Sequence, residues 1–169
     1  MASEEFIVLR IIHIVAGSFW VGASVFLALI LEPTLEALGP SIKGPVMSSL
    51  GRKIGPMIGI TATLTIGAGI ALAFRLEATN LVVFDSAWGV AILLGFIVSV
   101  LAFGTGIITG LAANRMAKLG AQLQAAEGPP PPELLACMAA LSQRLKVAGR
   151  SSAVLTLVGV GAMASARFV

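Results

Sequence analysis

The chain has 169 residues, of which 57% are hydrophobic and only 11% are charged, and its mean hydropathy is +1.00. Soluble domains contain roughly 45–50% apolar and about 25% charged residues, so this composition excludes an ordinary soluble globule. The formal charge of +3 does not indicate nucleic-acid binding, because the basic residues lie at the ends of apolar segments and form no continuous stripe. We therefore expect one integral membrane domain, surrounded by the lipid bilayer and without a soluble catalytic domain.

Four apolar segments are long enough to cross a bilayer, which takes about 20 residues per helix. We place these spans at about 6–31, 54–74, 86–113 and 151–168. The first is expected to be a retained helix, because Glu4 and Glu5 stand where a signal peptide would be basic. The second is expected to have Pro56 in its first helical turn. The predicted fold class is all-α, an integral membrane four-helix bundle formed by residues 1–169 as one domain.

A short helical hairpin is expected to extend from the bundle into water between the third and fourth spans. Leu119 and Leu123 face a later apolar series with coiled-coil spacing. This later series comprises Leu134, Met138, Leu141 and Leu145. Gly128 and the four prolines after it cannot continue a helix, so we place the hairpin tip at about 127–132.

The distribution of Lys and Arg predicts the orientation in the membrane. Eight of the eleven lie in the loop between the first two spans or in the hairpin, and the other three are Arg10, Arg75 and Arg167. Basic residues are in excess on the cytoplasmic side of membrane proteins. We therefore expect a multi-pass protein of the inner (plasma) membrane with both termini outside the cytoplasm, and with the only cysteine, Cys137, inside it.

Glycines are expected to let the helices approach one another, since small residues are enriched at helix contacts in membranes. Gly106 and Gly110 form a small-xxx-small pair on the third span. On the second and fourth spans, close contacts are expected at Gly67, Gly69, Gly159 and Gly161. These glycines predict tight packing and carry no further function.

One face of the first span differs from its surroundings. It carries Arg10, His13, Gly17, Trp20 and Ser24, at successive spacings of three and four residues. The only histidine of the chain, His13, lies inside this span. An ionisable residue in such a position usually faces a bundle interior or a cavity. The tryptophan lies near the middle of the bilayer and not in the interfacial belt, so we expect it to pack inside. The glycine between them leaves a notch for a neighbouring helix or for a flat macrocycle.

This face suggests a haem site as one interpretation. Met163 lies at a depth comparable to His13, and imidazole and thioether are a known axial pair for haem iron. Arg10, Arg75 and Arg167 fall on the same side of the membrane and can bind propionates. A second ligand would come from this methionine, from a partner subunit, or from the histidine of a second copy. The histidine can instead form a structural hydrogen bond between helices, or serve in transport or proton relay.

Other chemistry receives less support. Glu32 and Glu36 flank Pro33, where a carboxylate pair can serve a metal or a proton site but more often marks a helix end. Gly104 to Gly106 lies within an apolar span and not after a strand, so it is no phosphate-binding loop. A single cysteine can form neither an intrachain disulfide nor a multi-cysteine metal site.

The segment from Leu9 to Gly22 resembles the opening helix of a superfamily of small multi-helix membrane proteins. Its members include the copper-resistance D-type domains and the bacterial membrane protoporphyrinogen oxidase. The shared features are a histidine, a tryptophan seven residues later and a glycine shortly after it, here His13, Trp20 and Gly22. The resemblance implies a four-helix bundle and, in the oxidase branch, haem held by the first-helix histidine. Arg10 lies where the oxidase pattern places a lysine, and the methionine- or histidine-rich motifs of the copper branch are missing.

The sequence therefore predicts a small haem-binding or haem-handling membrane protein with His13 as the iron ligand and Trp20 as a pocket wall. The alternative is a non-enzymatic accessory subunit that packs against a larger membrane complex. A transporter is the third hypothesis, but four short spans without a broken helix give it little support. The expected partners are lipid and a second copy or a larger complex, and not nucleic acid.

Overall fold

The structure is a computed structural model that describes residues 4–75, 86–125 and 131–168. These ranges are almost entirely helical and contain no strand. The helices are α1 (Glu4–Phe26), α2 (Glu32–Leu38), α3 (Pro40–Arg75), α4 (Ala87–Ala125) and α5 (Pro132–Ser165). Four helical stretches are long and apolar enough to cross a membrane. The predicted class, an all-α membrane four-helix bundle, is confirmed.

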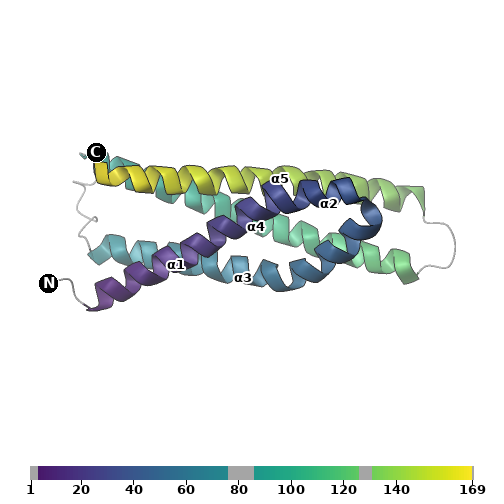
Figure 1. Cartoon of the computed structure of the whole chain (residues 1–169), viewed down its shortest axis with the longest axis horizontal. Coiled ribbons are helices and arrows are strands. Elements are labelled where there is room, and N and C mark those ends of the chain that lie inside the picture. Colours follow the sequence, from purple (N-terminus) through teal and green to yellow (C-terminus); the bar gives the residue numbers. More distant parts are fainter. Residues whose placement is uncertain (1–3, 76–85, 126–130, 169) are drawn as a thin grey trace.

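The bundle is elongated, and both ends of the chain lie at the same end of it (Figure 1). Helix α1 packs mainly against α3, and α4 packs mainly against α5. The α2–α3 turn lies at the opposite end, together with the C-terminal end of α4 and the N-terminal end of α5 (Figure 1). We call this second end the basic end, because it carries Lys43, Arg52, Lys53, Arg115, Lys118, Arg144, Lys146 and Arg150. The first we call the terminal end.

The sequence predicted one helix over 6–31, but the first span is not a single regular α-helix. A π-helical turn over Leu27–Leu31 separates α1 from α2, and the N–H of Glu32 donates to the carbonyl of Leu27. Pro33 follows in the first turn of α2, and because proline has no N–H it cannot continue the regular ladder. Helix α2 ends at Leu38, and Gly39 follows with a φ of +90°, a conformation that favours glycine.

Helix α3 begins well before the predicted second span. It has 36 residues, or roughly 54 Å at 1.5 Å per residue, whereas the hydrocarbon core is about 30 Å thick. Pro45 and Pro56 both lie inside it, so the prediction that Pro56 occupies the first turn is wrong. The prediction followed the apolar residues alone, but the helix continues through the polar residues at the basic end.

The predicted helical hairpin extends α4 and α5 beyond the apolar spans. Helix α4 continues to Ala125, and α5 starts at Pro132 after an extended Pro131. The apolar series on both helices is partly buried while most of its neighbours are exposed, which agrees with a seam between the two helices. The prolines that are described mark the start of α5, and the rest of the predicted tip, at 127–130, lies outside the described residues.

Close contacts occur at some of the predicted glycines only. A Cβ added to Gly69 or Gly159 would lie about 3.0–3.1 Å from side-chain atoms of a neighbouring helix, so these two predictions are confirmed. Within the described ranges, a Cβ would meet no atom within 4 Å at Gly67, Gly106, Gly110 and Gly161. These four predictions are wrong for the single chain, because the helix faces that carry these glycines do not meet a neighbouring helix.

Candidate functional site

His13 on α1 is joined to α3 by a hydrogen bond. Its Nδ1 lies 2.8 Å from the backbone carbonyl oxygen of Thr65, and the bond is partly buried. A carbonyl can only accept, so Nδ1 carries the hydrogen, and in the neutral ring the lone pair is on Nε2. This is the protonation pattern in which a histidine is ready to bind a metal through Nε2, with its other nitrogen held by a carbonyl.

Two glycines let α1 and α3 approach closely enough for this bond. A Cβ on Gly69 would lie 3.0 Å from Cε1 and 3.1 Å from Nδ1 of His13. One on Gly17 would lie 3.3 Å from Cγ2 of Thr65. The notch at Gly17 is therefore filled by a residue of α3. Of the two occupants that the sequence left open, a neighbouring helix is the one found in this chain.

The second ring nitrogen of His13, which is half-buried, has no hydrogen-bond partner among the described residues. In the described part of the chain, every buried side-chain nitrogen or oxygen has a hydrogen-bond partner. The only hydrogen bond found there for His13 is the one through Nδ1. Nε2 is therefore not fully enclosed by the described residues and has no partner among them, which leaves it available to a ligand.

Trp20 lies in the interior, as its position in the span predicted. It is 4% exposed and forms the core with Ala62 and Ala102. Its ring meets Phe103 of α4 edge to face, with centroids 6.5 Å apart and an interplanar angle of 86°. In the single chain this side chain is surrounded by α3 and α4 residues, so it packs the bundle.

The three arginines at the terminal end have different surroundings. Arg75 pairs with Glu5, at 2.5 Å between Nη2 and Oε2, which ties the end of α3 to the start of α1. The guanidinium of Arg167 lies 5.0 Å from the ring centroid of its neighbour Phe168. Arg10 is exposed on α1. None of these contacts brings the three side chains together into one anion site in the described structure.

Met163 of α5 packs against α4 at Gly95. A Cβ on Gly95 would lie 2.6 Å from Cγ and 3.2 Å from Cε of Met163. Gly95 was not among the predicted contact glycines, although Ala91 and Ser99 are small residues four positions away on either side. The thioether thus belongs to the α4–α5 pair, while the imidazole belongs to the α1–α3 pair.

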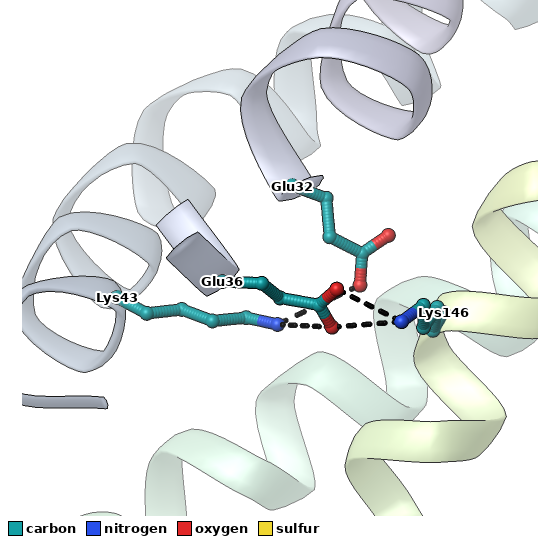
Figure 2. A network of polar contacts seen from close by, with 4 residues as sticks. All are labelled: Glu32, Glu36, Lys43 and Lys146. Atoms are coloured by element: carbon teal, nitrogen blue, oxygen red, sulfur yellow. Dashed lines mark hydrogen bonds and ion pairs between the residues drawn. The ribbon is translucent and has the colours of Figure 1, made fainter. Parts of the chain in front are cut away.

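The basic end holds a network of charged residues that the sequence did not predict (Figure 2). Glu36 of α2 accepts hydrogen bonds from Lys146 of α5, at 2.8 and 3.0 Å, and from Lys43 of α3, at 3.3 Å. Lys43 also lies 3.7 Å from Glu32. The carboxylates at the helix end therefore bind lysines. In the described ranges, no three His, Cys, Asp or Glu residues come together in a way that suits a metal ion.

The site rests on geometry alone. Comparisons of the chain with protein-family models, with curated proteins and with solved structures found no match. The resemblance of the first helix therefore stays a prediction. The residue best suited to bind a ligand in this structure is His13, because one ring nitrogen is held by α3 and the other has no partner among the described residues.

Proposed function

We propose that this protein is a small integral membrane protein that binds haem through Nε2 of His13. The observation that supports the proposal most is the hydrogen bond from Nδ1 to the carbonyl of Thr65, which fixes the tautomer and leaves the other nitrogen accessible. Membrane haem proteins use such neutral imidazoles as axial ligands. A bound haem would supply one-electron redox chemistry or serve as the molecule that is handled.

The fit of the other predicted residues is partial. Trp20 and Gly17 pack against residues of neighbouring helices in the same chain. Met163 packs on α4. Because Met163 belongs to the α4–α5 pair, we infer that the second ligand comes from outside this chain. A second copy that presents its own His13 is the simplest source, since the pair would be two identical imidazoles. Arg10 is exposed one turn before His13 and is the arginine best placed to bind a propionate.

We further infer that the basic end faces the cytoplasm of a cell whose inner (plasma) membrane holds the protein. Eight of the eleven Lys and Arg residues belong to this end, and basic residues near the ends of spans are retained on the cytoplasmic side. Both termini then lie on the other side, and so does the end of α1 that carries His13.

The experiment is the visible absorption spectrum of the detergent-purified protein, oxidised and then reduced, with haem content measured by pyridine haemochrome. Wild type is expected to show a Soret band that is lost in His13→Ala. His13→Asn keeps a donor at the position of Nδ1 for the carbonyl of Thr65 but loses the imidazole, so it separates ligation from folding. Met163→Leu is expected to keep the band, and a ratio of one haem to two chains would support ligation by two copies.

The alternative is a non-enzymatic accessory subunit of a larger membrane complex. The observation in its favour is that the hydrogen bond to Thr65 already gives His13 a structural role, since such bonds join helices in membranes. A well-folded wild type that is colourless and takes up no haem on reconstitution would overturn the haem proposal and leave this alternative.

A further inference from the structure

A groove between α4 and α5 opens at the basic end of the bundle, with a volume of about 240 Å³. Each helix contributes one arginine to it, Arg115 from α4 and Arg144 from α5. The other lining residues are mainly apolar and include Leu111 and Leu141. The groove therefore combines two positive charges with an apolar floor.

The positive charges of this groove are not balanced within the described part of the chain. None of the lining residues is acidic, and the ion pairs found in the described ranges involve Lys43, Arg75 and Lys146 as cations. Lys146, on the same helix as Arg144, forms an ion pair with Glu36. The two arginines of the groove remain available for an anion from outside.

The groove lies where the apolar part of α4 ends. The sequence of α4 is apolar up to Ala113 and becomes polar with Asn114 and Arg115. On the membrane side of the arginine, Ile108 and Leu111 are 62% and 67% exposed. Arginines at this depth can reach the headgroup region, while the exposed apolar residues face the hydrocarbon chains.

We propose that this groove binds an anionic phospholipid. The phosphate would lie between the guanidinium groups of Arg115 and Arg144, which are suited to phosphate because they donate two parallel hydrogen bonds each. The acyl chains would leave the groove past Ile108 and Leu111, which line its membrane side, since its volume suits a headgroup alone. Basic pockets between membrane helices bind anionic headgroups in this way. The proposal is independent of haem binding.

The test is native mass spectrometry of the full chain from mixed micelles of phosphatidylglycerol and phosphatidylcholine. Wild type is expected to retain phosphatidylglycerol in preference to phosphatidylcholine. The double variant Arg115→Gln/Arg144→Gln is expected to lose this preference by roughly tenfold or more, from the removal of two positive charges near the headgroup. The matched control is Arg52→Gln/Lys53→Gln, which removes two positive charges from the same end, on α3 and outside the groove, and is expected to keep the preference.

Two results would overturn the proposal. In the first, the groove variant and the control retain phosphatidylglycerol equally, which would assign any preference to overall charge. In the second, inorganic phosphate displaces the lipid as well as added phosphatidylglycerol does, which would make the site one for free phosphate. If the double variant does not keep the helical circular dichroism of wild type, the single variants Arg115→Gln and Arg144→Gln decide, because each is expected to lose part of the preference.

Discussion

Lys146 and Glu36 are 110 positions apart in the sequence, and the Nζ of the lysine lies 2.8 Å from Oε2 and 3.0 Å from Oε1 of the carboxylate. The pair joins α2 to α5, and Lys43 brings in α3 through the same carboxylate. Three helices that belong to different parts of the bundle are therefore connected at its basic end by one carboxylate (Figure 2).

Glu36→Gln is expected to weaken this connection and to lower the thermal unfolding midpoint slightly. The effect should shrink as the salt concentration rises, because exposed charges are screened. A double-mutant cycle with Lys146→Gln measures the pair directly, and the double variant is expected to lose less than the sum of the single losses. Lys118→Gln, on α4, is the control, because it removes a charge from the same end but outside this network. Losses that simply add would show that the two residues do not interact.

The sequence predicted the class of the fold well but the helix boundaries poorly. Hydropathy marks the four apolar spans, because the hydrocarbon core requires them. It does not mark where a helix continues into water, so the start of α3 at Pro40 was missed. The π-helical turn before Pro33 was missed for a similar reason: apolar periodicity carries no sign of a shift by one residue in the hydrogen-bond ladder.

Prediction of the site was limited by contacts between distant segments. The spacing of His13, Gly17 and Trp20 placed them on one face of α1, and Trp20 packs inside as expected. The partner of His13 is a backbone carbonyl on α3, and no side-chain pattern reveals which carbonyl will lie opposite. Lys146 was counted only for topology, because nothing in the sequence connects it to Glu36.

Gly69→Ala is expected to displace the imidazole of His13 and to destabilise the α1–α3 pair by about 1–3 kcal/mol, as overpacking does. The added methyl group would lie 3.0 Å from Cε1 of the ring, closer than a carbon contact allows. Gly67→Ala is the matched control, since a Cβ there meets no described atom within 4 Å. It is expected to be neutral or to stabilise by up to about 1 kcal/mol. Unfolding in detergent, followed by circular dichroism, measures both.

If Gly69→Ala and Gly67→Ala unfold at the same denaturant concentration, the close contact at His13 does not contribute to stability. In a haem-loaded preparation the same pair of variants gives a second readout. Only Gly69→Ala is expected to shift the Soret band, because only that change acts on the imidazole.

Trp20→Ala is expected to cost about 3–5 kcal/mol of stability, since it removes a large side chain from a closed interior. Trp20 is 4% exposed and contacts the ring of Phe103 on α4. Phe19→Ala is the control, because Phe19 is 37% exposed and faces the lipid. A cycle that includes Phe103→Leu separates the edge-to-face contact, expected at about 0.5–1.5 kcal/mol. Equal losses at positions 19 and 20 would contradict the interior placement.

The inferred orientation can be tested with the only cysteine of the chain. Cys137 is exposed on α5 at the basic end, so a maleimide that cannot cross membranes is expected to label it only after the cells are permeabilised. Glu4→Cys in a Cys137→Ala background places a thiol at the terminal end, where Glu4 is exposed, and is expected to react in intact spheroplasts. The opposite pattern would place the basic end outside, against the distribution of Lys and Arg. Because the two thiols lie at opposite ends of one bundle, each serves as the control for the other.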